Sequence, residues 1–215
     1  MQTANNKKAK LFQLKMLPLD MSRLILYPML LFAFRCRKFD KNGEKYRKKL
    51  KGNAIIASNH FSQVDAMKIT SAFWYRRMYY FIAEIVMKGR IRNFLLSKAG
   101  GIKIDRNLFD IEAINKAVDV LKNGHVLSIF PQGGVKKDGE VEEVKSGAVL
   151  IAQRADAPIY PVFIKKRKHW YNCVKVYIGD PIYPSQYVKG KFMTAVDLEN
   201  ISQDLMKAIN ECANN

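Results

Sequence analysis

The sequence predicts a single α/β domain in which a mixed, mostly parallel sheet is covered by helices on both faces. From residue 52 onward, short apolar runs typical of buried strands alternate with segments of helical periodicity, and this alternation is typical of α/β sheets. Polar, glycine-bearing loops separate the two kinds of segment. The length of 215 residues allows one domain with a substantial core and hardly two.

The first half of this region is expected to contain short strands and two helices. The run AIIAS is compact and β-branched, which favours a buried strand. The Gly100-Gly101 pair ends the second helix, since glycine is common just after a helix. The elements expected are, in order, a strand at 54–58, a helix at 65–75, a strand at 78–83, a helix at 90–98 and an extended stretch at 102–104.

The second half gives the clearest helix of the chain. From Ile114 to Leu121 apolar residues recur at i, i+3, i+4 and i+7 on one face, and Asn123-Gly124 provides a C-cap. Pro131 ends the strand that follows. The elements expected are, in order, a helix at 109–122, a strand at 125–130, a helix at 146–155, strands at 159–164 and 173–178, and an amphipathic helix over 198–212.

Positive charge is concentrated in the N-terminal part of the chain. The net charge is +18. Residues 1–51 carry 14 Lys/Arg and 3 Asp/Glu, and therefore +11 of this total. Such an excess favours a polyanionic partner: nucleic acid, an anionic membrane surface, or a phosphorylated or acidic substrate. Nucleic acid is disfavoured, because the charge surrounds an apolar segment and no zinc-knuckle or RNP-type motif occurs.

The apolar segment is LILYPMLLFAF, residues 24–34. As a helix it would be about 16 Å long, too short to span a hydrocarbon core of roughly 30 Å. No signal-peptidase pattern follows it. We expect it to lie in the membrane interface with its flanking lysines on anionic head groups; the alternative is a helix packed on the protein's own core. We therefore divide the chain into a basic, membrane-docking segment at 1–51 and a catalytic domain at 52–215.

Neither a metal nor a disulfide framework is expected. The three cysteines, Cys36, Cys173 and Cys212, are odd in number and have no ligand spacing. Bystander thiols in a reducing, cytosol-facing setting are the simplest interpretation.

Two polar loops follow predicted strands directly: SNHFSQVD after 54–58 and FPQGG after 125–130. Functional loops gather at the carboxyl ends of parallel strands, so both loops are expected at one site. If His60 lies on the turn and Asp65 in the first helical turn, the carboxylate can orient the imidazole and leave its other nitrogen as a base. The alternative is purely structural: Ser62 and Asp65 form an S-x-x-D pattern close to a capping box.

Three further stretches are ambiguous when taken singly. In GGIKIDR, 100–106, Arg106 can present a planar fork to a phosphate, or the stretch is a helix end, an edge strand and a surface ion pair. In FPQGG the glycine pair can form an anion-binding nest, or it is an ordinary loop. APIYPVFI, 157–164, by itself is simply a strand.

Taken in order, these stretches resemble the glycerolipid acyltransferases of the lysophosphatidic acid acyltransferase type. That family has four ordered blocks: N-H-x4-D, G-x-x-x-I-D-R, F-P-E-G-T-R and V-P-I-x-P-V. Here they are Asn59-His60-FSQV-Asp65, Gly100-GIK-Ile104-Asp105-Arg106, Phe130-Pro131-Gln132-Gly133-Gly134 and Ala157-Pro158-Ile159-Tyr160-Pro161-Val162.

The resemblance implies transfer of an acyl group from acyl-CoA or acyl-carrier protein to the hydroxyl of a lysophospholipid, foremost 1-acyl-glycerol-3-phosphate, in phospholipid biosynthesis. His60 would be the general base and Asp65 its supporting acid. No cofactor is implied beyond the acyl-donor substrate. By the same resemblance, the protein is expected to work as a peripheral or monotopic protein on the cytoplasmic face of the membrane. The residues implied in acceptor binding are Asn59, Arg106, Gln132, Gly133, Gly134 and Lys136.

The third block departs from the family pattern. Gln132 stands where the family has Glu, and Val135 where it has Arg. Lys136 or Lys137 can supply charge to a phosphate, but without arginine's bidentate fork. The acceptor head group therefore stays open, and a lipid-binding member that has lost catalysis is the alternative function.

Overall fold

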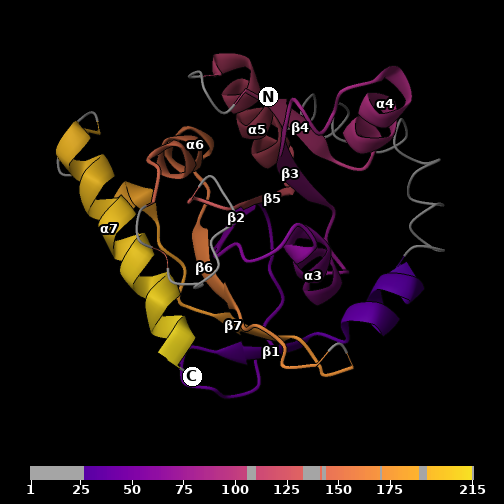
Figure 1. Ribbon diagram of the computed structural model, residues 1–215. Helices are drawn as coiled ribbons and strands as arrows, with labels where there is room; N and C mark the ends of the chain where they lie inside the picture. The colour runs from indigo at the N-terminus through magenta and orange to yellow at the C-terminus, as the bar shows by residue number, and fades with distance from the viewer. Residues whose placement is uncertain are drawn as a thin grey trace.

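A seven-stranded sheet runs through the centre of the computed structural model and carries helices on both faces (Figure 1). The structure describes residues 27–105, 110–132, 141, 144–169, 171–188 and 193–214. The strands are β1 (Arg37–Asp40), β2 (Ala54–Ser58), β3 (Met78–Ala83), β4 (Gly101–Ile104), β5 (Val126–Ile129), β6 (Ile159–Ile164) and β7 (Lys175–Ile178). The helices are α3 (Asp65–Ala72), α4 (Arg90–Lys98), α5 (Ile111–Lys122), α6 (Gly147–Ala155), α7 (Ala195–Glu211) and the 3-10 turns η1 (Pro184–Gln186) and η2 (Cys212–Asn214).

The strand order is β1-β7-β6-β2-β5-β3-β4. β2 lies in the middle and is parallel to both β5 and β6, and β3 and β4 extend the parallel part. β7 is antiparallel to β6. Residues 165–174 join these two strands, and a parallel crossover needs roughly a dozen residues or more. The mixed, mostly parallel sheet predicted from the sequence is confirmed.

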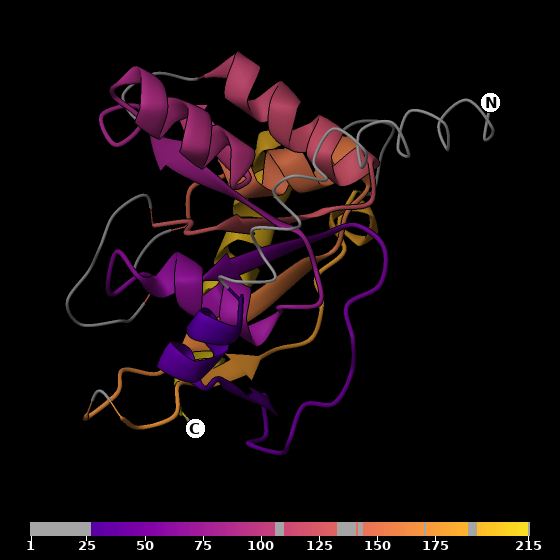
Figure 2. The same cartoon turned by 90° about the vertical axis from the view of Figure 1, so that its right-hand side faces the viewer.

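Two apolar clusters lie on opposite faces of the sheet. Ile55 belongs to a cluster with buried side chains of α5, α6 and α7, whereas Ile56 belongs to one with Ile69 and Phe73, in α3 and just after it. Successive residues of a strand point to opposite faces, so β2 contributes to both clusters. The predicted helical cover on both faces is therefore present, and Figure 2 shows the layers from the side.

Most expected elements are found within one to three residues of their expected ends. β1 and η1 were not expected. β1 reads RKFD, which is mostly polar, and its burial is partial, so it carries no strand-like apolar signal. It pairs in parallel with β7 at the edge of the sheet.

β1 also bears on the division of the chain. It lies inside the 1–51 segment, yet it belongs to the same sheet as the rest. The last part of that segment is thus built into the predicted catalytic domain. Whether the preceding residues dock on a membrane stays a prediction, and residues 1–26 lie outside the described ranges.

The second part of the apolar run is helical over residues 27–34. Phe34 packs partly against the α3 cluster, while Met29 and Phe32 are 60% and 82% exposed. This helix therefore contacts the core on one side and leaves large apolar groups on the other. None of the helices in the described part of the chain has the length and hydropathy to cross a bilayer.

Candidate functional site

Two adjacent strands deliver the two aromatic rings at the centre of the site. β2 and β5 are parallel neighbours, with Ala57 opposite Ile129. The residues that follow them therefore emerge at the same edge of the sheet. There the rings of His60 and Phe130 stack, with centroids 4.1 Å apart and planes at 16°. The prediction that the SNHFSQVD and FPQGG loops meet is confirmed for these two residues.

Asp65, the first residue of α3, holds the turn that carries His60. Its Oδ2 accepts hydrogen bonds from the backbone N–H groups of Phe61 and Ser62, both at 2.7 Å. The same oxygen lies 3.2 Å from His60 Nδ1. Because the ionised carboxylate can only accept a hydrogen bond, Nδ1 carries the proton and donates a hydrogen bond to Oδ2. The expected fold-back of the chain between positions 60 and 65 is present.

The other carboxylate oxygen has a cation of its own. Lys68 Nζ lies 2.7 Å from Asp65 Oδ1, and the side chains of Lys68 and Asp65 are 11% and 0% exposed. Charge pairing in such a shielded place is far less screened than at the surface. Asp65 is thus the middle member of a buried His60–Asp65–Lys68 triplet.

The protonation of Asp65 follows from these contacts. Burial alone raises the pKa of its carboxyl group, but the hydrogen bonds from His60 and Lys68 and from the Ser62 backbone outweigh burial. The pKa of Asp65 therefore lies below the ordinary aspartate value. The carboxylate stays ionised at neutral pH, which fixes the His60 tautomer and leaves Nε2 facing away from Asp65.

The capping-box alternative is present in one of its two hydrogen bonds: the Ser62 N–H donates to Asp65 Oδ2 at 2.7 Å, whereas the Asp65 N–H donates to the Ser62 carbonyl and not to its hydroxyl. The N-cap of α3 is Val64, and no side chain accepts a hydrogen bond there. Ser62 Oγ accepts a hydrogen bond from the Val64 N–H, at 3.4 Å. The two carboxylate oxygens of Asp65 contact His60, Lys68 and the backbone N–H groups of the turn before the helix.

Asn59 lies at the site but is engaged in the fold. Its amide Oδ1 accepts from the Ile164 N–H at 2.8 Å, and its Nδ2 donates to the Ile164 carbonyl at 3.2 Å. The residue is completely buried. Its side chain joins the end of β2 to the end of β6 through these two hydrogen bonds. This arrangement does not support the predicted contact between Asn59 and a substrate. We assign Asn59 the role of positioning the turn that carries His60.

The other predicted acceptor-binding residues are mostly outside the described ranges. Arg106, Gly133, Gly134 and Lys136 belong to this group, so their contacts stay predictions. Gln132 is described at the end of the β5 loop and is partly buried. It follows Phe130, which stacks on His60, by two residues.

The glycines of the second block have a structural reason. Gly100 has φ +96°, and a Cβ there would lie 2.5 Å from the Met78 carbonyl oxygen. A Cβ on Gly101 would lie 2.6 Å from Ile82 Cδ1 and 2.8 Å from the Leu96 carbonyl oxygen. The two glycines therefore allow α4 to pass directly into β4. This agrees with the interpretation of the stretch as a helix end followed by an edge strand.

Sequence reasoning missed Lys68 and the stacking of Phe130. Lys68 is three residues after Asp65, a spacing at which helix side chains meet, and this signal was available. Phe130 was quoted only as part of the third block, because its approach to His60 depends on the order of the strands.

Two cysteines lie in settings that suppress thiolate chemistry. Burial raises the pKa of Cys36 to about 11 and that of Cys212 to about 12. Cys36 Sγ also donates to the Lys68 carbonyl oxygen at 3.4 Å. A thiol with so high a pKa is a poor nucleophile at neutral pH.

The chain is similar in sequence to known acyltransferases. Residues 38–165 match the family model described as Acyltransferase. A 1-acyl-sn-glycerol-3-phosphate acyltransferase of Bacillus subtilis is 25% identical over 138 residues, covering 62% of this chain and 68% of that protein. A probable 1-acyl-sn-glycerol-3-phosphate acyltransferase of Mycoplasma pneumoniae is 24% identical, covering 73% of this chain and 65% of that protein.

A solved structure gives the same fold. The crystal structure of a 1-acyl-sn-glycerophosphate (LPA) acyltransferase from Thermotoga maritima superposes with a TM-score of 0.60 at 19% identity. The match covers 91% of this chain and 81% of that one. This share is larger than that of the family-model match at residues 38–165.

Proposed function

We propose, from the premise that the chain belongs to the acyltransferase family and is an acyltransferase, that it transfers a fatty acyl group from a thioester to a lysophospholipid hydroxyl. The first acceptor to consider is 1-acyl-glycerol-3-phosphate, because the relatives named above carry this activity in their names. The observation that carries the proposal is the His60–Asp65 pair at the carboxyl end of β2, with Nδ1 and Oδ2 3.2 Å apart.

The reaction depends on Nε2 of His60, the ring nitrogen that faces away from Asp65. His60 Nε2 takes the proton of the acceptor hydroxyl while the hydroxyl oxygen attacks the thioester carbonyl carbon. The tetrahedral intermediate collapses, the C–S bond breaks, and the thiolate leaves and receives the proton from the imidazolium. The products are an ester and a free thiol, and no residue is acylated. A general base of this kind contributes roughly 10² to 10⁴ in rate.

Asp65 supports the positive charge that appears on His60 during the attack. Its position is set by two backbone N–H groups at 2.7 Å, so no reorganisation is needed when the imidazolium forms. Phe130 limits the ring on one face. The base is therefore held in one tautomer and one plane before the substrate arrives.

The acceptor phosphate is assigned to the loops after β4 and β5. Arg106 can bind two phosphate oxygens, and the Gly133-Gly134 backbone and Lys136 can add donors at the same place. Gln132 and Val135 stand where the family has Glu and Arg, so we do not assign the acceptor a single head group. Both acyl-CoA and acyl-carrier protein are retained as donors.

We place the protein on the cytoplasmic face of an anionic membrane, bound peripherally. Support comes from the helical residues 27–34. Arg167 donates to the Ala33 carbonyl at 3.2 Å, and Arg35 donates to the Tyr171 carbonyl at 2.9 Å. These bonds fix the helix to the 165–172 loop, while Phe32 stays 82% exposed.

The test is an acceptor screen with mass spectrometry of the products. Full-length protein is mixed with vesicles holding single lysophospholipids and with acyl-CoA or acyl-carrier protein in turn. We expect an acylated product with at least one phosphate-bearing acceptor. A protein inert across all acceptors and both donors would contradict the proposal.

The screen also separates the catalytically impaired alternative. Gln132→Glu with Val135→Arg restores the family's third block. If the native chain is inert and the restored chain is active, the lipid-binding alternative is favoured. The intact His60–Asp65 pair is the reason to expect the opposite.

A further inference from the structure

α4 exposes a stripe of large apolar side chains. No residue of this helix is buried, and Ile91, Phe94 and Leu95 are 77%, 61% and 57% exposed. They stand at i, i+3 and i+4, so they share one face of the helix. A surface helix normally turns such a face toward the core. Leu96, on another side of α4, is only partly buried.

The turn before α4 also exposes large apolar side chains. Ile85 and Val86 are 70% and 48% exposed, while Met87 between them and the helix is almost completely buried, at 3%. Met87 thus anchors the segment to the domain, and the exposure of its neighbours does not come from a loosely attached loop. Large exposed apolar side chains gathered in one short segment favour an interaction surface.

Charge identifies the kind of partner. Between residues 85 and 104 the sequence has five basic residues, Lys88, Arg90, Arg92, Lys98 and Lys103, and no acidic ones. Lys103 pairs with Glu84 at 2.8 Å. Lys98 Nζ lies 5.8 Å from the centre of the Phe94 ring, which keeps an ammonium group beside the apolar stripe.

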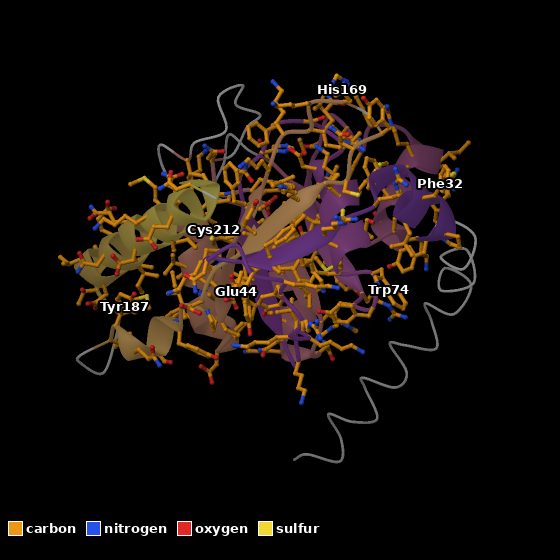
Figure 3. All side chains as sticks on the ribbon, turned by 90° about the horizontal axis from the view of Figure 1, so that it is seen from below. Phe32, Glu44, Trp74, His169, Tyr187 and Cys212 are labelled. Carbon is orange, nitrogen blue, oxygen red and sulfur yellow. The ribbon has the colours of Figure 1, made fainter. Side chains whose placement is uncertain are left out.

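The helix α4 lies on the same side of the molecule as the helical residues 27–34. Both project from the right-hand side in Figure 1, where α3 also lies, and this side faces the viewer in Figure 2. Figure 3 labels Phe32 and Trp74 on this side and Tyr187 on the other. Trp74, just after α3, is 54% exposed.

We propose that Ile85, Val86, Ile91, Phe94 and Leu95, with Lys88, Arg90, Arg92 and Lys98, form a second membrane-docking surface that binds an anionic lipid bilayer. We name this set the α4 surface. Apolar groups flanked by lysine and arginine are the composition that lies in a bilayer interface. The inference rests on the proposed membrane-bound function and adds a contact separate from residues 1–51.

Two docking sites have a consequence that one site lacks. The helix at 27–34 and the α4 surface lie apart on one side of the domain, so together they fix its rotation on the bilayer. Asp65 begins α3, which lies on that side as well. An acceptor whose acyl chain stays in the lipid can then present its hydroxyl to His60 without leaving the membrane.

The apolar part is tested by vesicle sedimentation of the full chain. Ile91→Gln/Phe94→Gln/Leu95→Gln should lower partitioning onto phosphatidylglycerol–phosphatidylcholine vesicles by at least ~10-fold, since three large apolar side chains no longer enter the lipid. The fold should survive, because none of the three is buried. Thermal unfolding measured beside the binding verifies this.

A matched pair of single variants controls for loss of any exposed apolar group. Phe94→Gln removes a side chain 61% exposed, and Val196→Gln one 67% exposed near the start of α7, which lies on the left in Figure 1, away from α4. Only Phe94→Gln should weaken binding. Equal binding by wild type and the triple variant overturns the inference, as does equal weakening by both single variants.

The charged part is tested on vesicles of different composition. Arg90→Gln/Lys98→Gln should weaken binding to phosphatidylglycerol-containing vesicles and leave binding to pure phosphatidylcholine unchanged. An equal loss on both would contradict a role for anionic lipid. A wild-type dimer in solution that the triple variant abolishes would also overturn the inference, because a second copy would then cover the surface.

These measurements separate the two proposals. Binding is read without any acyl transfer, so an inactive protein still reports on the α4 surface. If wild type itself fails to bind anionic vesicles, the membrane placement falls. If wild type binds and the triple variant binds equally well, only the role of α4 falls.

Discussion

Lys68 and Asp65 form an ion pair within the first turn of α3, with Nζ and Oδ1 2.7 Å apart and both side chains shielded from solvent. The carboxylate that orients His60 is thus neutralised from its other side. The pair is therefore part of how the site is held together, and it gives the first prediction.

Lys68→Met should destabilise the protein by about 3 kcal/mol, since it leaves a buried carboxylate without its cation. Lys116→Met is the matched control: Lys116 pairs with Glu112 at 2.6 Å, but the two side chains are 59% and 80% exposed. That pair should be worth less than about 1 kcal/mol. Urea unfolding measures both, and similar small losses in the two variants would contradict the burial argument.

The lowered pKa of Asp65 predicts how stability depends on acid. The folded-state pKa lies below the unfolded value, so the unfolded chain binds more protons in the window between them. The stabilisation is complete above about pH 5 and is lost as the pH falls through about 4 toward the folded pKa. Asp65→Asn should have a lower free energy of unfolding at neutral pH and a shallower acid dependence. Parallel curves for the two proteins would contradict the assignment.

The stacking of Phe130 on His60 predicts a positioning effect. Phe130→Ala should reduce kcat by ~10-fold or more while KM changes little, because the base loses its fixed plane. Phe130→Tyr keeps the ring and should retain most of the activity. If the alanine variant changes only KM, Phe130 binds substrate and does not orient the base.

The two hydrogen bonds between Asn59 and Ile164 predict a structural cost. Asn59→Ala leaves the buried N–H and carbonyl of Ile164 unpaired, which should cost about 1–3 kcal/mol. The midpoint of thermal unfolding should fall, while KM for the acceptor stays near the wild-type value. A raised KM with unchanged unfolding would restore the substrate contact expected from the sequence.

The fold could largely be predicted from the sequence, because several of its strands are continuous apolar runs. AIIAS, MYYFIA and IYPVFI coincide with β2, β3 and β6. β1 was missed because RKFD has no such run, and it becomes a strand only through its partner β7. Tertiary pairing decides such edge strands, and local composition does not.

The site was readable in part for the same reason. His60 and Asp65 are local in sequence, so their spacing sufficed to expect the contact. Phe130 reaches His60 only because β5 lies next to β2, which the sequence does not specify. Asn59 was expected to face the substrate, but the position of β6 draws its amide to the Ile164 backbone.

The most direct test of the central claim is the single-turnover rate of acyl transfer in His60→Gln, using the acceptor and donor that the screen identifies. His169→Gln is the control, because His169 is exposed in the loop after β6, where it stacks on Tyr171. A general base predicts a loss of roughly 10² to 10⁴-fold or more for His60→Gln, with the wild-type rate in His169→Gln and unchanged unfolding in both. A His60→Gln protein that transfers acyl groups at the wild-type rate would contradict the account.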